Sequence, residues 1–296
     1  MRSAPVYSLL IALAAPSAPG ASLSADKLAA EKRLPRQETV VLLHGLSRTT
    51  RSMRKMETAL QRSGYRVINL AYPAGRKPIE EMPDHIENQL RECCGGTGAR
   101  LHFVTHSFGG IVLRHYLEQR PLAGLGRVVM LSPPNGGSEL ADVLRRVPVL
   151  RNAAGPNRPR LGTDHEGLPA RLGPVGFELG VIAGDRSLNP LFSWLIPGPD
   201  DGFVSVERAR VAGMTDFLVV RHTHTFIMQR QEVVEQVLKF LRDGAFDHED
   251  VAAPPPRPHR DRPVMPTRPA LPGRPRDRTP RPSETSAPAR QPPAAA

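Results

Sequence analysis

Short apolar runs alternate with amphipathic stretches along residues 38–243 of the 296-residue chain. Continuous apolar runs bounded by turn residues predict strands buried on both faces, and apolar residues three or four apart predict helices. The predicted strands are 39–43, 65–70, 101–105, 127–131, 177–183 and 216–221. The predicted helices are 51–63, 78–94 with a possible break at Pro83, 109–119, 138–146 and 233–241. This alternation predicts an α/β domain over residues 38–246: an open, mostly parallel six-stranded sheet with helices on both faces.

Residues 1–25 resemble a secretory signal peptide. They carry one positive charge (Arg2), an apolar run at 6–15 and small residues after it. That run is too short to span a bilayer as a helix. Residues 26–37 then form a linker. If the signal is real, the protein is exported, periplasmic or secreted; otherwise it is cytoplasmic.

Residues 247–296 form a tail rich in Pro, Arg and Ala. Such a sequence buries too little apolar surface to offset its chain entropy, so we predict disorder with polyproline II character. Residues 252–296 hold 9 arginines and 3 acidic residues, which is most of the net charge of +11. The remaining charge does not indicate a specific nucleic-acid binder. The tail could make weak contact with anionic surfaces.

Two other features limit the chemistry. The only cysteines, Cys93 and Cys94, are adjacent, which rarely suits a disulfide, and no histidine cluster accompanies them. We therefore expect no metal and no other cofactor. Residues 147–200 contain irregular insertions rich in Pro, Gly and Arg, of which 147–176 are a candidate lid or substrate wall.

The strongest chemical signal is the sequence HSFGG at 106–110, between a predicted strand and a predicted helix. A serine at such a sharp turn presents its Oγ above the sheet edge, with the first helical N–H groups behind it. This predicts Ser107 as a nucleophile, with His106 and Gly109 supporting the turn. Thr105 stands where a small residue is usual, which makes the approach of strand and helix a tighter fit.

A serine nucleophile needs a base, which a third group must orient. His222 and His224 both follow the last predicted strand, and their spacing alone does not separate them. We favour His224 because it leads directly into the final helix, and keep His222 as the alternative.

The third group should be a carboxylate on a tight loop. Asp201, before Gly202 in PDDGFVSV, is our choice, with Asp200 and Asp185 as alternatives.

An oxyanion hole needs two converging N–H groups. Phe108 would supply one and Leu46 the other. His44 and Gly45 support Leu46, and Gly45 allows close backbone approach.

VVLLHGL, VTHSFGG, PDDGFVSV and HTHTFIM, in this order, resemble the α/β-hydrolase superfamily. They are most similar to its small bacterial lipase and esterase members, whose sheet lacks the first two strands of larger relatives. The resemblance covers about residues 38–243. It implies a Ser107-Asp201-His224 triad that hydrolyses carboxylic esters of small molecules or lipids without a metal or organic cofactor.

Two alternatives remain open at this point. The same triad could act as an acyltransferase, passing the acyl group to an acceptor other than water. The chain could also be a non-catalytic envelope binding module of the same fold that uses its basic tail. The oligomeric state is not indicated by the sequence.

Overall fold

The structure is a computed structural model that describes residues 38–94, 100–146 and 155–249. The predictions for the signal peptide, the linker, residues 147–154 of the insertion and residues 250–296 of the tail lie outside these ranges. The predicted domain limits stay predictions. Within the described ranges, no helix is both long and apolar enough to cross a membrane.

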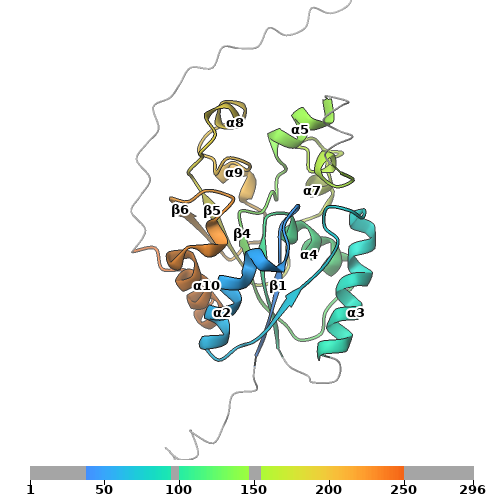
Figure 1. Cartoon of the computed structure of the whole chain (residues 1–296), viewed down its shortest axis with the longest axis vertical. Coiled ribbons are helices and arrows are strands. Elements are labelled where there is room, and N and C mark those ends of the chain that lie inside the picture. Colours follow the sequence, from blue (N-terminus) through green and yellow to red (C-terminus); the bar gives the residue numbers. More distant parts are fainter. Residues whose placement is uncertain (1–37, 95–99, 147–154, 250–296) are drawn as a thin grey trace, which may run out of the picture. The chain divides into compact units, whose positions relative to one another are not determined.

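Six parallel strands form one open sheet in the order β2-β1-β3-β4-β5-β6 (Figure 1). The strands are β1 (Thr39–Leu43), β2 (Arg66–Leu70), β3 (Leu101–His106), β4 (Leu125–Leu131), β5 (Leu179–Gly184) and β6 (Asp216–Val220). The predicted fold class is confirmed, and the sheet is parallel throughout. Each predicted strand overlaps an observed one, and no bound differs by more than two residues.

The helices that cover the sheet match the predicted ones. They are α2 (Arg54–Arg62), α3 (Met82–Cys94), α4 (Phe108–Gln119), α5 (Glu139–Arg146) and α10 (Gln231–Asp243). Pro83 does not interrupt its helix, because it lies in the first turn of α3, where a missing N–H costs no hydrogen bond. A 3₁₀ turn, η2 (Ile79–Glu81), precedes it.

Several short helical segments accompany the longer helices. They are η1 (Thr50–Met53), η3 (Arg158–Arg160), α7 (Leu168–Arg171), α8 (Pro190–Leu195), α9 (Val206–Ala209) and η4 (Ile227–Gln229). The η1 segment forms the start of the helix predicted at 51–63, and the others lie outside the predicted helices. Helices of one or two turns hold too few residues to show a period of 3.6 in the sequence. Side-chain caps start two of them: Asn189 accepts from the N–H groups of Leu191 and Phe192, and Ser205 from that of Arg208.

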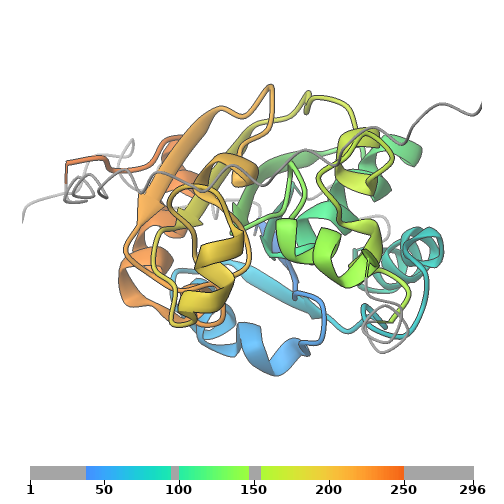
Figure 2. The same ribbon diagram turned by 90° about the horizontal axis from the view of Figure 1, so that it is seen from above.

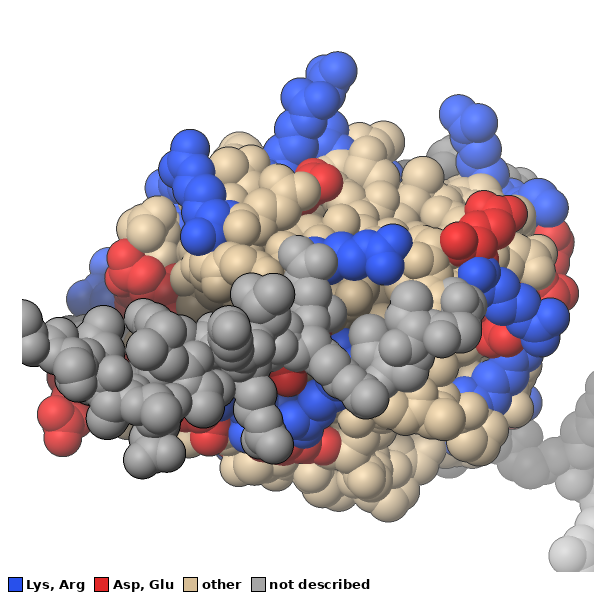
Figure 3. All heavy atoms as spheres, turned by 90° about the horizontal axis from the view of Figure 1, so that it is seen from below, with Lys and Arg blue, Asp and Glu red and all other residues tan. Residues whose placement is uncertain are grey.

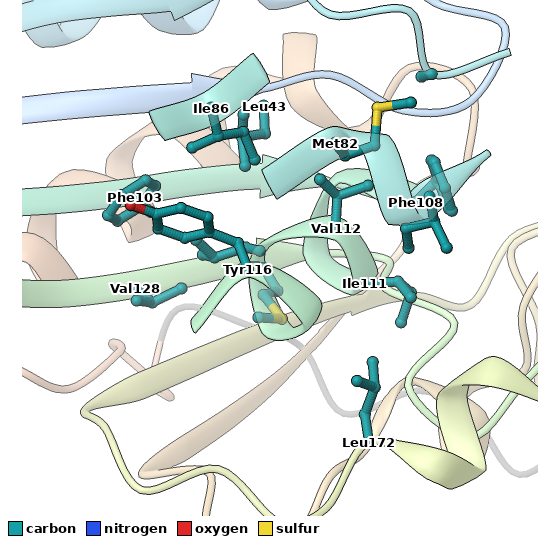
Figure 4. Packing of buried hydrophobic residues seen from close by; sticks show 14 of the residues in the cluster. Leu43, Met82, Ile86, Phe103, Phe108, Ile111, Val112, Tyr116, Val128 and Leu172 are labelled. Carbon is teal, nitrogen blue, oxygen red and sulfur yellow. The ribbon is translucent and has the colours of Figure 1, made fainter. Parts of the chain in front are cut away.

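Two apolar layers sandwich the sheet because successive strand residues point to opposite faces. In β1, Val41 and Leu43 join the layer beneath α3 and α4, whereas Val40 and Leu42 join the layer beneath α2 and α10. Figure 4 shows the first layer, where Tyr116 of α4 lies among core residues that include Phe103 of β3. Strands covered on both faces explain the continuous apolar runs in the sequence.

The strand order reverses between β1 and β3, and this reversal positions the site. Parallel α/β sheets bind ligands outside the carboxyl ends of their strands at such a point. Leu43 is paired with Thr105, so β1 and β3 end side by side. The loops that begin at His44 and His106 therefore leave the sheet next to each other.

Gly109 and Gly110 allow the start of α4 to pack closely against these strand ends. A Cβ on Gly109 would lie 2.5 Å from Leu43 O and 2.9 Å from His44 O, so a side chain there would meet backbone. A Cβ on Gly110 would lie 3.3 Å from Thr105 Oγ1. The branched Thr105 side chain is thus accommodated because the helix residue facing it has none.

Residues 155–176 of the insertion are attached to the loop that follows β2. The buried Asn157 side chain donates from Nδ2 to Ala74 O and Lys77 O, both at 2.8 Å. Arg160 forms a two-pronged ion pair with Glu80, which lowers the pKa of that carboxyl to about 2. A lid function of the insertion stays a prediction.

Candidate active site

Ser107 lies between β3 and α4 in a backbone conformation that non-glycine residues rarely adopt, with φ 54° and ψ −124°. Such a conformation costs about 1–3 kcal/mol and persists only where surrounding contacts impose it. Here the Ser107 N–H donates to Leu131 O at 2.8 Å, and the Gly110 N–H donates to Ser107 O at 3.0 Å. The sheet and the helix together hold the serine at the tip of the turn.

A line of hydrogen bonds joins Ser107, His224 and Asp201. His224 Nδ1 lies 2.8 Å from Asp201 Oδ2, and His224 Nε2 lies 2.9 Å from Ser107 Oγ. A carboxylate only accepts, so the neutral imidazole carries its proton on Nδ1 and leaves Nε2 to accept from the serine hydroxyl. The structure brings together the three residues that the sequence favoured, in the arrangement of a serine-histidine-aspartate relay.

The Asp201 carboxylate is buried and held by its own loop. Its Oδ1 accepts from the N–H groups of Phe203 at 3.0 Å and Val204 at 2.8 Å, which leaves Oδ2 for His224. The His224 N–H also donates to Asp201 O at 3.0 Å. Backbone and side-chain bonds between the two residues therefore fix the plane of the imidazole.

His106 supports His224 from the other side. It is buried, and its Nε2 donates to the backbone oxygen of His224 at 2.9 Å, with the two rings 5.0 Å apart. Burial lowers the pKa of His106 well below its ordinary value, and the neighbouring His224 lowers it further. His106 therefore stays neutral. It positions His224 through this hydrogen bond and does not compete with the His224 imidazole for a proton.

The loop after β1 packs closely against Ser107 and His106 at Gly45. A Cβ on Gly45 would lie 3.1 Å from Ser107 Cβ and 2.9 Å from His106 Nδ1, so only glycine fits without a shift. The turn closes with the Arg48 N–H on Gly45 O at 3.2 Å. Among the described residues, the N–H groups of Leu46 and Phe108 have no acceptor, as two oxyanion donors require.

Two residues that the sequence did not single out hold this loop in place. Tyr72, just past β2, stacks on His44 with ring centroids 4.4 Å apart, and its buried hydroxyl donates to His44 O. Arg158 of η3 donates from Nη2 to Ser47 Oγ at 2.9 Å, and Ser47 itself has a φ of 58°. Neither belongs to a motif, and no sequence signal could have linked Arg158 to a loop 111 residues earlier.

The alternative residues have other partners. His222 Nε2 lies 2.9 Å from Glu232 Oε2 on α10, so its side chain is engaged away from Ser107. Asp200 is buried and accepts at Oδ1 from Ser193 Oγ and the Gly202 N–H, which fixes the turn before Asp201. Asp185 is buried directly after β5, and its N–H donates to Val220 O. Over the part of the chain that the structure describes, no group of three or more His, Cys, Asp or Glu side chains is arranged to hold a metal ion.

Comparisons with known proteins give structural likenesses only. No family model matches the chain, and no curated protein matches it. The mature lipase BlEst2 of Bacillus licheniformis has a TM-score of 0.58 and 20% identity over 70% of this chain and 93% of the lipase. Phospholipase PlaB of Legionella pneumophila has a TM-score of 0.57 and 14% identity over 71% of this chain and 60% of the phospholipase. The metagenomic carboxyl esterase MGS0156 has a TM-score of 0.52 and 21% identity over 64% of this chain and 65% of the esterase. At these identities the likeness shows the fold, and the chain has the α/β-hydrolase fold.

Proposed function

We propose that the chain is a serine hydrolase that cleaves carboxylic esters. The observation that carries this proposal is the line of hydrogen bonds from Asp201 Oδ2 through His224 to Ser107 Oγ, at 2.8 and 2.9 Å. Likeness to lipases and an esterase supports the same reaction class. The proposed substrate is an ester of a small molecule or a lipid.

The first half of the reaction forms an acyl-enzyme. Ser107 Oγ bonds to the ester carbonyl carbon while its proton passes to His224 Nε2, and the N–H groups of Leu46 and Phe108 hold the oxyanion. Asp201 stabilises the imidazolium that forms. The carbon–alkoxy bond then breaks, and His224 gives its proton to the leaving alcohol.

The second half repeats these steps with water. His224 takes a proton from water, the hydroxide attacks the acyl carbon, and Ser107 regains its proton as the acid leaves. The chain's own residues supply every proton acceptor and oxyanion donor in this sequence.

The test is labelling by a fluorophosphonate probe, together with hydrolysis of a short-chain p-nitrophenyl ester. We expect both for the purified protein, and the loss of both for Ser107→Ala. Ser132→Ala is the matched control, because Ser132 also follows a strand, has a φ of 48° and donates its N–H to the next strand at Ile182 O. Pro133 and Pro134 follow it and carry no N–H, so we expect labelling of Ser132→Ala to equal that of the wild type. A folded wild-type protein that neither labels nor turns over would reject the triad and favour a binding module.

A further inference from the structure

Exposed apolar side chains gather at the candidate site. Within the described part of the chain, every large apolar side chain that is strongly exposed lies in the segments that carry Asp201 and His224. These are Leu188, Leu191, Trp194, Phe203 and Phe226. Leu188 is 81% exposed, Trp194 66% and Leu191 64%. Single exposed apolar residues are ordinary, whereas a cluster beside a functional site indicates a contact surface.

The outermost part of this cluster is α8 with the residue before its cap. Residues 187–199, SLNPLFSWLIPGP, contain no charged side chain. Leu191 and Trp194 are three apart in α8 and thus lie on one face, which is turned to solvent. Figures 1 and 2 place α8 at the end of the domain where the strands terminate. The exposed face therefore lies at the same end as Ser107.

Aromatic rings connect α8 to the site. Phe192 of α8 meets Phe203 with ring centroids 6.0 Å apart, and Phe203 meets His224 at 5.0 Å. The apolar surface is thus continuous from α8 to the imidazole that contacts Ser107. A molecule that approaches over α8 reaches the nucleophile without crossing a charged barrier.

Two exposed arginines flank this surface in the sequence. Arg186 and Arg221 follow the ends of β5 and β6, are exposed, and form no ion pair with any described residue. The segments 186–199 and 221–230 contain no acidic residue, and Asp185, Asp200 and Asp201 are buried. At the opposite end of the sheet positive and negative groups are interspersed, as where Arg100 and Arg127 both contact Glu178 (Figure 3).

We propose that Leu188, Leu191 and Trp194, flanked by Arg186 and Arg221, form a docking surface for an anionic lipid layer. Tryptophan and leucine enter the boundary between head groups and acyl chains, and arginines at the rim meet anionic head groups. A specific protein interface buries about 800 Å² on each partner, more than one short helix and a neighbouring leucine provide. The inference deepens the proposed function, on which it rests, by naming the source of the ester: a negatively charged membrane surface from which lipid passes over Phe203 to Ser107.

Trp194 is the only tryptophan in the chain, so its fluorescence reports contact at this surface directly. The experiment uses the full chain carrying Ser107→Ala, which leaves the vesicles intact and makes docking independent of hydrolysis. Vesicles of phosphatidylcholine alone are compared with vesicles that contain phosphatidylglycerol. We expect the Trp194 emission to shift to shorter wavelength only with phosphatidylglycerol, and brominated lipid to quench it.

Variants in the same background separate the apolar and charged contributions. Leu188→Ser/Leu191→Ser should weaken binding by at least tenfold, because a buried leucine side chain contributes a factor of about ten or more. Arg186→Gln and Arg221→Gln should each weaken it by about fivefold, the effect of one cation at an anionic surface. Arg62→Gln, at the exposed end of α2, is the matched control and should change binding by less than twofold. Thermal unfolding midpoints check that each variant is folded.

Three outcomes would overturn the docking surface while leaving hydrolysis by Ser107 intact. In the first, vesicles bind the chain but the Trp194 emission does not move, as expected if only the arginines of the tail make contact. In the second, binding to phosphatidylcholine alone is equally strong. In the third, the emission is already at short wavelength without lipid, so that a second copy or another part of the chain covers the surface. Conversely, a protein that docks as expected but lacks esterase activity in its wild-type form would reject the proposed function alone.

Discussion

Two neighbouring glycines at the start of α4 allow the geometry of the site to be tested by adding one methyl group. In Gly109→Ala the new Cβ would lie 2.5 Å from Leu43 O and 2.9 Å from His44 O. These two carbonyl oxygens belong to the backbone and cannot rotate away as a side chain can. The start of α4 must therefore move from the end of β1 by roughly 1 Å, so that the new Cβ reaches a contact distance of about 3.5 Å from them. In Gly110→Ala the nearest atoms are Met130 Sδ at 3.1 Å and Pro133 Cβ at 3.2 Å, so the surroundings need to move by only a few tenths of an ångström.

The two substitutions should affect activity very differently. A displacement of about 1 Å between a nucleophile and its oxyanion donors lowers the rate by up to about 10²-fold. Overpacking costs about 1–3 kcal/mol, offset by up to about 1 kcal/mol from replacing a helical glycine. We therefore expect Gly109→Ala to lose about 0–3 kcal/mol of stability and most of the proposed esterase activity, and Gly110→Ala to keep activity within about fivefold of wild type.

The assay is kcat and KM for a short-chain p-nitrophenyl ester, with urea unfolding as the measure of stability. Because Ser107 remains present in both variants, the rate of fluorophosphonate labelling gives a second reading of how well the nucleophile is placed. If Gly109→Ala and Gly110→Ala lose activity equally, close contact between α4 and the end of β1 does not set the position of Ser107, and the reasoning fails.

Three further predictions concern single side chains around the site and the response to pH. Asp201→Asn should lower kcat by about 10³- to 10⁴-fold with unchanged circular dichroism, because an amide neither fixes the Nδ1–H tautomer of His224 nor stabilises its imidazolium. A loss below tenfold would speak against Asp201 as the partner of His224. Tyr72→Phe keeps the ring stacked on His44 but loses the hydrogen bond to His44 O. We expect about 1 kcal/mol lower stability and a lower kcat at unchanged KM. An unaltered kcat would show that the position of the loop after β1 does not depend on that hydrogen bond. Burial lowers the pKa values of His44, His102 and His106, so in acid the unfolded chain binds protons that the folded chain does not. The free energy of unfolding should therefore fall as pH falls below about 6.5, by up to about 1.4 kcal/mol per pH unit for each histidine; urea unfolding at pH 7.5 and 5.5 that gave equal stability would contradict this.

Much of the fold was predictable because each strand is covered on both faces. Runs such as 39–43 and 101–105 are mostly apolar on both faces of the strand, and repeated runs of this kind between helices are typical of a buried parallel sheet. The sharp turn that holds Ser107 was predictable because strand, turn and helix are contiguous in the sequence. His224 and Asp201 could be ranked because each has a local context, one before the last helix and one in a tight Asp-Gly turn.

The remaining contacts depend on how distant segments meet. Nothing near Tyr72 or Arg158 in the sequence shows that each holds the loop after β1, because their partners are 28 and 111 residues away. The contact of His222 with Glu232, which separates it from His224 in the structure, likewise could not be seen in the sequence. The insertion was hard to predict because η3 buries no residue and is held by the ion pair of Arg160 with Glu80, and because the four residues of α7 are too few to show a helical period.

The bonds from His224 to the turn at Ser107 also have a kinetic meaning. They join residues 117 and 118 positions apart, between the third strand and the loop before the last helix. Contacts of such long sequence separation form late, since the intervening chain must first be ordered. Until the C-terminal loop packs against β3, His224 does not contact Ser107. Under the proposed function, a chain still emerging during synthesis would therefore be inactive, and reactivity of Ser107 would mark the completion of folding from β1 to α10.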